Sequence, residues 1–238
     1  MYSRKLNEKV SAGIACCRKG DAGFEVLVVK KRYSYAYNVF VNGRYRGDNS
    51  ELIQLFNKMT IDEKLDVLSL NFVQIWYRIW LHNPQKTSNF YIAKSKYENT
   101  FAIDGGAHLR KLMSRSTQSI DLIWEIPKGR KKNKSESDLQ CGIREFAEET
   151  GVQRKKYKVF DDYTKYSYIS DGTRYTNIYY YAFSRDKFEP KVNIADSMQI
   201  GEIADIRWMP LIQIQAVDTS KRLYPVVRKL FNYVKGRL

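Results

Sequence analysis

Three glutamates in the second half of the chain have the spacing of a metal site. Glu145, Glu148 and Glu149 are spaced i, i+3 and i+4, so a helix would carry their carboxylates on one face. Like charges at that spacing repel, and a cation between them would remove the repulsion. Hard carboxylate oxygens suit Mg²⁺ or Mn²⁺. The spacing therefore predicts a Mg²⁺ or Mn²⁺ site, with a solvated acidic helix face as the alternative.

The neighbouring residues predict the helix that positions these glutamates. Leu139, Ile143 and Phe146 are spaced i, i+4 and i+7 and form one apolar stripe. Gly151 is placed to end the helix in the left-handed conformation. The basic loop 128–134 precedes the helix and can meet phosphate oxygens. A metal, a phosphate and a carboxylate base together are what the attack of water on a diphosphate linkage requires.

The stretch 129–152, GRKKNKSESDLQCGIREFAEETGV, resembles the signature of the Nudix hydrolases. That signature is Gly, five residues, Glu, seven residues, then Arg-Glu-apolar-any-Glu-Glu-any-Gly-apolar. Residues 144–152 match at every defined position, and seven residues separate Glu136 from Arg144. The one departure is a loop of six residues between Gly129 and Glu136, which we interpret as a benign insertion because surface loops tolerate one extra residue.

The resemblance implies a role for each matching residue. Glu148 and Glu149 would bind the metal, Arg144 would orient the glutamates by charge-assisted hydrogen bonds, and Glu202 would be a further ligand or base rather than an exposed loop glutamate. The expected catalytic residues are Glu145, Glu149, Glu202 and Arg144. The expected metal ligands are Glu145, Glu148, Glu149 and the carbonyl of Gly129. The expected substrate-binding residues are Lys128, Glu136, Lys31, Arg32, Tyr33, Lys131 and Lys132.

The residues Lys31, Arg32 and Tyr33 also suit a nucleotide on chemical grounds. Cations meet phosphates, and aromatic rings stack on bases. The equal alternative is a strand end with solvated lysines and tyrosines at the edge of the core.

The layout resembles the Nudix α/β/α sandwich with a mixed sheet, of the α/β (α+β) class. The strand and turn signals predict strands at 9–17, 24–32, 120–126, 157–169, 174–183 and 203–209. Helical spacing predicts a closing helix in the tail from Thr219, with Pro225 near its start.

A helical insertion at 36–117 is expected to split the Nudix domain into residues 1–35 and 118–238 and to assist RNA binding. Asn49-Ser50 is expected to cap a short helix that runs through Asn57, and Thr60 with Glu63 predicts a capping box. The following helix is predicted to run to Asn83-Pro84. Its broad apolar face would comprise Leu65, Leu68, Phe72, Ile75, Trp76, Ile79 and Trp80. A third helix is expected after Gly105-Gly106.

The composition favours a polyanionic partner. The formal net charge is +15 and the pI is near 9.6, which favours nucleic acid over a membrane surface. The three cysteines lack zinc-site spacing and are interpreted as reduced thiols. The N-terminus lacks a signal-peptide core and no stretch reaches transmembrane length, so we expect a cytoplasmic protein, in the host cytoplasm if viral. The sequence does not determine the oligomeric state.

The motif Trp124-Glu125-Ile126-Pro127-Lys128-Gly129 narrows the resemblance. Its ending is typical of mRNA-decapping Nudix members and of some diphosphoinositol-phosphate members. Residues 31–34 and 201–203 extend the similarity to the decapping enzymes of large cytoplasmic DNA viruses, of the African swine fever virus type. The resemblance implies removal of the 5′ cap of mRNA, which releases methylated guanosine diphosphate and 5′-monophosphate RNA.

Two alternatives remain open. One is hydrolysis of diphosphoinositol polyphosphates or of other small nucleoside-diphosphate-linked compounds, which also suit a very basic site. The other is an inactive RNA-binding module, against which the intact glutamates argue.

Overall fold

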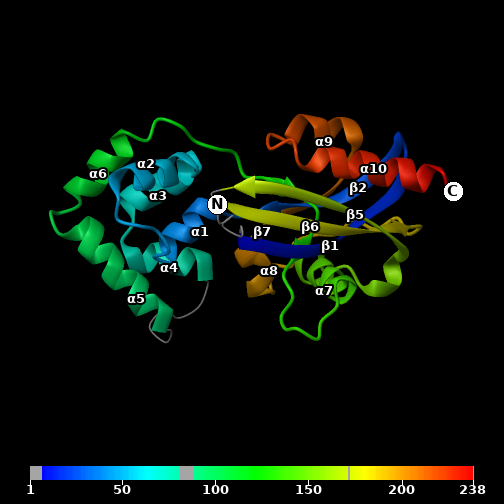
Figure 1. Ribbon diagram of the computed structural model, residues 1–238, viewed down its shortest axis with the longest axis horizontal. Helices are drawn as coiled ribbons and strands as arrows, with labels where there is room; N and C mark the ends of the chain where they lie inside the picture. Colours follow the sequence, from blue (N-terminus) through cyan, green and yellow to red (C-terminus); the bar gives the residue numbers. More distant parts are fainter. Residues whose placement is uncertain (1–6, 81–87, 171, 238) are drawn as a thin grey trace, which may run out of the picture. The chain divides into compact units, whose positions relative to one another are not determined.

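The computed structural model describes residues 7–80, 88–170 and 172–237 (Figure 1). The chain forms two compact units. One is built around a sheet and comprises the chain up to Lys30 and from Ile123 onward. The other is helical and spans Lys31–Leu122, five residues wider at each end than the interval expected for the insertion.

The first unit contains a mixed sheet in the strand order β3-β2-β1-β6-β5. The long strand β1 pairs antiparallel with β2 and parallel with β6, in a register that places Ala12 beside Ile178. Short β4 also pairs with β1, and β7 pairs with β2. The strands are β1 Asn7–Gly20, β2 Gly23–Lys31, β3 Trp124–Glu125, β4 Lys128–Gly129, β5 Lys158–Ser170, β6 Thr173–Ser184 and β7 Ile203–Pro210.

Helices cover both faces of this sheet (Figure 1). On one face α7, Asp138–Thr150, packs its Phe146 against Ile14 and Leu27. On the other face α10, Leu223–Lys235, packs against Ala15 and Val26 together with α9, Leu211–Val217. Successive residues of β1 and β2 thus face opposite cores, as strand geometry requires. The expected α/β/α sandwich with a mixed sheet is confirmed.

Two shorter elements complete the first unit. The 3₁₀ turn Arg154–Lys156 follows α7, and α8, Ser197–Glu202, precedes β7. The strand expected at 120–126 is wrong in length, because only Trp124 and Glu125 pair with β2.

The helical unit has its own aromatic core. Its helices are α1 Tyr35–Val41, α2 Asn49–Asn57, α3 Ile61–Ser69, α4 Phe72–Trp80, α5 Ser88–Tyr97, the π-helix Glu98–Ala102 and α6 Ala107–Ser114. Phe40 contacts the rings of Tyr45, Phe56 and Phe101, with ring centroids 5.6–5.7 Å apart. Such ring contacts stabilise a core beyond the area that they bury.

Three helix predictions have clear outcomes. The capping box of Thr60 and Glu63 is confirmed, and so is the helix after Gly105-Gly106. The short helix expected through Asn57 is present as α2, but the cap expected at Asn49-Ser50 is wrong, because the carboxylate of Asp48 caps α2 by accepting from Ser50 N at 2.8 Å.

The single long helix expected after Thr60 is also wrong. The chain leaves the helix after Ser69, and Asn71 starts α4 by exchanging hydrogen bonds with Gln74, each at 3.0 Å. The interruption turns Leu65 and Leu68 outward, so they are 56% and 44% exposed rather than part of one buried stripe. The stop expected at Asn83-Pro84 lies outside the described residues.

Two remaining expectations concern cysteines and membranes. Cys16, Cys17 and Cys141 are free and buried, in agreement with reduced thiols. Among the described residues, no helix has the length and apolarity that crossing a membrane would require.

Candidate active site

Helix α7 carries the three glutamates, and its ends are defined by local hydrogen bonds. Ser137 Oγ accepts from Gln140 N at 3.1 Å, while Gln140 Oε1 accepts from Ser137 N at 2.8 Å. This reciprocal pair satisfies two backbone donors at the helix start. Gly151 ends the helix with φ of 69°, a left-handed conformation that favours glycine.

Glycines allow α7 to approach the sheet closely. A Cβ added to Gly142 would lie 3.2 Å from the carbonyl of Gly13 on β1. A Cβ added to Gly129 on β4 would overlap the carboxylate of Glu145. Since Gly129 pairs with Ala12, the bare Cα of Gly129 leaves room for the first glutamate beside the strand. The sequence motif includes Gly129, but only the fold shows that Glu145 lies against it and that Gly142 approaches Gly13.

Arg144 joins the acidic residues of the motif. Its Nη1 lies 2.6 Å from Glu145 Oε1 and 2.9 Å from Glu148 Oε2. Its Nε donates to Glu136 Oε1 at 2.7 Å, and its Nη2 donates to the carbonyl of Arg130 at 2.9 Å. One guanidinium therefore fixes two glutamates of α7 relative to the loop that precedes the helix.

The six-residue loop between Gly129 and Glu136 contains a turn around Asn133. Its Oδ1 accepts from Ser135 N at 3.0 Å and from Glu136 N at 3.1 Å. Glu136 then accepts from Lys132 N at 2.7 Å while also contacting Arg144. The insertion therefore leaves Glu136 at the loop–helix junction, where it holds Arg144.

Two lysines contact the other glutamates. Lys132 Nζ lies 2.8 Å from Glu148 Oε1. Glu149 is only 3% exposed and accepts from Lys128 N at 3.1 Å. The Nζ of Lys128 forms an ion pair with Glu125 Oε2 at 2.5 Å. Glu125 was not singled out in the sequence, and its place three residues before Lys128, within the Trp-Glu-Ile-Pro-Lys-Gly stretch, is the signal that could have found it.

These contacts shift the pKa values of two carboxyl groups in opposite directions. Hydrogen bonds from Arg144 and from the backbone of Lys132 lower the pKa of Glu136 to about 2. Burial raises the pKa of Glu145; Arg144 opposes that shift, whereas the charges of Glu148 and Glu202 add to it. Glu202 is therefore close enough to Glu145 for their charges to interact.

Gln199 anchors the segment that carries Glu202. Its Nε2 donates to the carbonyl of Glu149 at 3.1 Å, and its Oε1 accepts from Asn193 N at 2.6 Å. This buried glutamine attaches α8 to the end of α7, and Glu202 is the last residue of α8. Sequence reasoning missed Gln199, because no local pattern marks a contact across 50 positions.

The remaining expected substrate residues divide between the two units. Lys131 lies on the loop before α7, where its Nζ is 2.8 Å from Asp138 Oδ1. Lys31, Arg32 and Tyr33 belong to the helical unit. There, Tyr33 Oη donates to the carbonyl of Arg78 at 3.0 Å, and its ring packs on Tyr37.

The glutamate face has the donor chemistry of a hard divalent cation. Glu145, Glu148 and Glu149 offer carboxylate oxygens, and the recess left by Gly129 receives one of them. Among the described residues, no three acidic, histidine or cysteine side chains are already gathered at metal-binding distances. Arg144 and Lys132 instead hold Glu145 and Glu148. A metal would therefore have to displace these cationic contacts.

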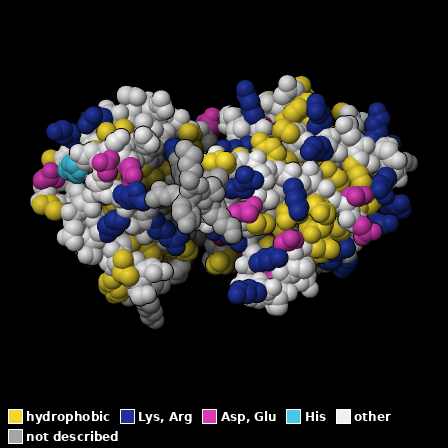
Figure 2. Space-filling view, viewed as in Figure 1, with side chains coloured by type: hydrophobic (Ala, Val, Ile, Leu, Met, Phe, Trp, Pro, Cys, Tyr) yellow, Lys and Arg dark blue, Asp and Glu magenta, His cyan; other side chains and the backbone are white. Residues whose placement is uncertain are grey.

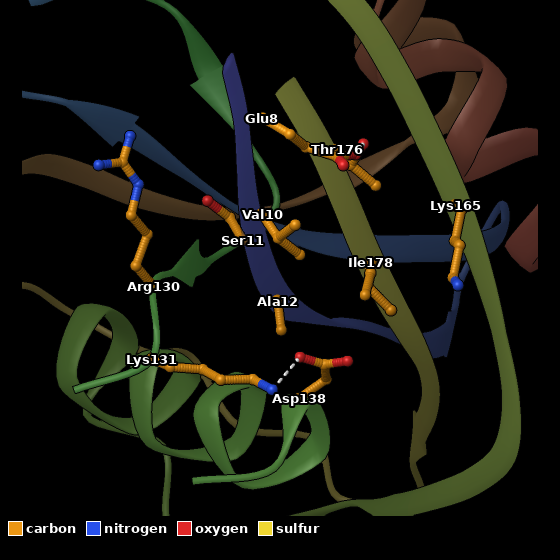
Figure 3. A pocket seen from close by; sticks show the side chains of 10 residues that line it. All are labelled: Glu8, Val10, Ser11, Ala12, Arg130, Lys131, Asp138, Lys165, Thr176 and Ile178. Atoms are coloured by element: carbon orange, nitrogen blue, oxygen red, sulfur yellow. Dashed lines mark hydrogen bonds and ion pairs between the residues drawn. The ribbon is translucent and has the colours of Figure 1, made fainter. Parts of the chain in front are cut away.

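A hollow of about 540 Å³ lies beside the start of α7 (Figure 3). Val10, Ala12 and Ile178 line it from β1 and β6, and Asp138, which also lines it, is the first residue of α7. The cationic lining residues are Arg130, Lys131 and Lys165. The hollow is contiguous with the Nudix loop, because Ala12 pairs with Gly129. Its volume is in the range of small-molecule sites.

Comparisons with known proteins place the chain in a family. The NUDIX domain family matches residues 107–230, just over half of the 238 residues. The chain is 36% identical over 242 residues to mRNA-decapping protein g5R of African swine fever virus (isolate Pig/Kenya/KEN-50/1950), which covers 97% of both proteins. The same protein of the Badajoz 1971 Vero-adapted strain is 35% identical over 244 residues, covering 97% of this chain and 96% of the relative.

Two solved structures of low sequence identity are also similar to this chain. A C. elegans Ap4A hydrolase has a TM-score of 0.49 and 14% identity, with 95% of this chain and 98% of that chain covered. A Nudix hydrolase from M. smegmatis, RenU, has a TM-score of 0.43 and 13% identity, with 98% and 88% covered. On the family match and on the identity to the full-length viral relatives, this chain belongs to the Nudix family of hydrolases.

Proposed function

We propose that this chain is a metal-dependent pyrophosphohydrolase that removes the 5′ cap of mRNA. The products would be methylated guanosine diphosphate and 5′-monophosphate RNA. The observation that carries this proposal is the match to mRNA-decapping protein g5R, which covers 97% of both chains and so includes the helical unit as well as the catalytic motif.

The metal in this proposal is Mg²⁺ or Mn²⁺, held by Glu145, Glu148 and Glu149. When bound, such an ion neutralises charge on the phosphates and activates a water molecule. Arg144 keeps the carboxylates oriented, and its contact with Glu136 fixes that orientation from outside the metal shell. Glu202 would act as a further base or ligand from the end of α8.

The hollow beside α7 would hold the nucleotide next to the scissile linkage. Its apolar lining suits a base, while Arg130, Lys131 and Lys165 suit phosphates. Lys and Arg side chains are spread over the visible surface of both units (Figure 2), as a polyanionic substrate would require. We further propose that the helical unit, with Lys31, Arg32 and Tyr33, contacts the RNA. Because the relatives are viral, we place the activity in the cytoplasm of an infected cell.

One observation favours a second candidate, the hydrolysis of diphosphoinositol polyphosphates. The loop ahead of α7 concentrates Arg130, Lys131 and Lys132 in consecutive positions. A dense array of cations suits a compact ligand with many phosphates as well as it suits RNA. The two candidates differ in whether the length of the RNA attached to the diphosphate linkage affects the rate of hydrolysis.

The deciding experiment incubates the protein with RNA labelled in the cap, with Mg²⁺ or Mn²⁺ supplied separately. Release of labelled methylated guanosine diphosphate supports decapping. Release of the monophosphate contradicts the proposed products. No release from capped RNA while a diphosphoinositol polyphosphate is hydrolysed rejects decapping in favour of the second candidate. The Glu149→Gln variant is the control for contaminating hydrolases.

A further inference from the structure

Two stacked tyrosines lie on the face of the sheet that α10 covers, close to the turn between β5 and β6. Tyr168 and Tyr175 are directly opposite in the strand register. Their ring centroids are 5.2 Å apart and the ring planes differ by only 12°. Both side chains are half-buried, so part of each remains accessible.

A cation lies over each of these rings. The guanidinium carbon of Arg222 is 3.7 Å from the centroid of the Tyr168 ring, and Lys9 Nζ is 5.6 Å from that of Tyr175. Within the described part of the chain, neither Arg222 nor Lys9 forms an ion pair. Their charges are therefore available to an anion that reaches the rings.

A well-defined turn presents Arg222. The carboxylate of Asp218 accepts from Arg222 N at 3.1 Å and from the backbone N of Leu223 and of Tyr224, each at 2.8 Å. Lys221, which directly precedes Arg222, has φ of 56° and is the one non-glycine with positive φ among the described residues. Such a conformation is costly and persists because Asp218 fixes the turn around it.

The acidic residue that neighbours Lys9 in sequence points to the other face of the sheet. Glu8 accepts a hydrogen bond from Thr176 Oγ1 at 2.9 Å and lines the hollow beside α7. Alternation along β1 and β6 therefore separates the carboxylate from the tyrosines. One face of the sheet therefore carries the two tyrosine rings with the cations of Lys9 and Arg222, which form no ion pair among the described residues. The opposite face carries the hollow.

We propose that Lys9, Tyr168, Tyr175 and Arg222, here called the tyrosine surface, bind single-stranded RNA. A base would displace Arg222 or Lys9 from the tyrosine ring that it covers and stack there, and the displaced cation, with Lys221, would meet phosphates. RNA is the fitting partner because it alternates flat rings with negative charges, as the surface alternates rings with cations. The inference rests on the proposed function, since it names where the RNA body of that substrate is held.

The test measures binding apart from catalysis. The full-length protein in EDTA is titrated against a fluorescein-labelled, uncapped RNA of 20 mixed-sequence nucleotides, and the Kd is taken from anisotropy. The double variant Tyr168→Leu with Tyr175→Leu keeps apolar bulk but removes the ring faces. We expect its Kd to rise about tenfold or more. An unchanged Kd would overturn the proposal.

The matched control is Tyr163→Leu on the same strand. Tyr163 is 48% exposed and has Lys165 Nζ 5.5 Å from its ring, but it lies on the opposite face, across from Tyr180. The Tyr163→Leu variant should bind the RNA with the wild-type Kd. If its Kd rises as much as that of the double variant, any exposed tyrosine supports RNA binding, and the assignment to Tyr168 and Tyr175 is overturned. Inorganic polyphosphate carries negative charge but no bases, so it tests the contribution of charge alone. Its Kd should be the same for the wild type and the double variant.

Two further measurements keep the proposal testable if the double variant does not fold. In the wild type, photocrosslinking with RNA that contains 4-thiouridine should label peptides bearing Tyr168, Tyr175 or Arg222, and labels found only elsewhere would overturn it. The variant Lys9→Gln with Arg222→Gln should reduce the log–log salt slope of binding by about 1.4. An unchanged slope contradicts the phosphate contacts.

Hydrolysis of a cap dinucleotide separates this inference from the proposed function. The double variant should hydrolyse the dinucleotide at the wild-type rate, because none of its residues belongs to the Nudix site. If the wild type hydrolyses neither the dinucleotide nor capped RNA while RNA binding still depends on the tyrosines, decapping is rejected and the tyrosine surface stands. If the wild type hydrolyses the dinucleotide and the double variant binds RNA as tightly as the wild type, decapping stands and the tyrosine surface is rejected.

Discussion

The carboxylate of Glu136 forms two hydrogen bonds with the guanidinium of Arg144, at 2.7 Å and 3.1 Å. The same guanidinium contacts Glu145 and Glu148. Glu136 therefore attaches the loop before α7 to the acidic face of the helix. The six-residue loop therefore still brings Glu136 to Arg144, with Glu136 N donating to Asn133 Oδ1 in the turn that precedes it.

The Glu136–Arg144 contact should make stability depend on pH. The pKa of Glu136 falls from its ordinary value of 4.5 to about 2 in the folded protein. A lowered folded pKa gives stability that is full above the unfolded value and is lost as pH falls toward the folded value. Glu136→Gln should therefore lower the unfolding midpoint at pH 7, and the difference from the wild type should shrink between pH 4.5 and 2. Thermal scans by circular dichroism measure this, and a difference that stays constant over that range would contradict the linkage.

Glu149→Gln should abolish hydrolysis while RNA binding survives. The change removes one carboxylate charge from the metal face, and its backbone partner, Lys128 N, can still donate to the amide oxygen. Loss of several kcal/mol of transition-state stabilisation corresponds to a fall of roughly 100-fold or more in kcat. Turnover is measured under saturating Mg²⁺, with the unfolding midpoint as the control for folding. Near-normal turnover would mean that Glu149 does not bind the metal.

Gly129→Ala should disable the site through one methyl group. The added Cβ would overlap the carboxylate of Glu145, which must then move. Displacement of a catalytic group by about 1 Å can cost on the order of 100-fold in rate. Gly47→Ala is the matched control, because its Cβ would meet nothing within 4 Å and its φ is not positive. Equal activity of the two variants would show that the Glu145 position is not critical.

Long capped RNA should be preferred over a cap dinucleotide, and the preference should shrink as salt rises. The dinucleotide reaches only the site beside α7, whereas an RNA body can also meet distant cations. The candidate contact segments are 30–32, 130–134, 154–156 and 228–229. A slope of about −0.7 per contact for single strands means that four to six contacts cost roughly two orders of magnitude between 50 and 200 mM salt. The measurement is the ratio of kcat/KM values for the two substrates at both salt concentrations, and a ratio near one at low salt would favour the small-diphosphate alternative.

The helical unit should fold alone if its full span is kept. Glu63 is 4% exposed and accepts from Ser34 N at 2.6 Å and from Ser34 Oγ at 2.7 Å. A fragment of residues 31–122 keeps this contact, but a fragment of residues 36–117 leaves a buried carboxylate without it. We expect cooperative thermal unfolding of the longer fragment and a lower midpoint for the shorter one. Equal midpoints would mean that Ser34 is dispensable, and a disordered longer fragment would mean that the unit depends on the Nudix domain.

Deleting the unit from the full chain tests its proposed RNA contacts, since an unchanged RNA affinity would reject them.

The amino-acid sequence by itself determined the elements whose signals are local. The spacing of Glu145, Glu148 and Glu149 along α7, and the capping box of Thr60 and Glu63, follow from hydrogen bonds and periodicity within a few residues. The break before α4 was equally local, since Asn71 and Gln74 cap its start. The apolar periodicity continued across the break and concealed it.

Only the tertiary structure decided which distant residues meet. The approach of Gly142 to Gly13, the bond from Gln199 to the end of α7, and the stacking of Tyr168 on Tyr175 join segments through the packing of the backbone. The same packing assigned Tyr33 to the helical unit, although it lies only two residues beyond β2. A pattern of residue types fixes which face of an element is apolar. The partner of that face depends on how closely the backbones can approach, and the side chains of the whole fold decide that together.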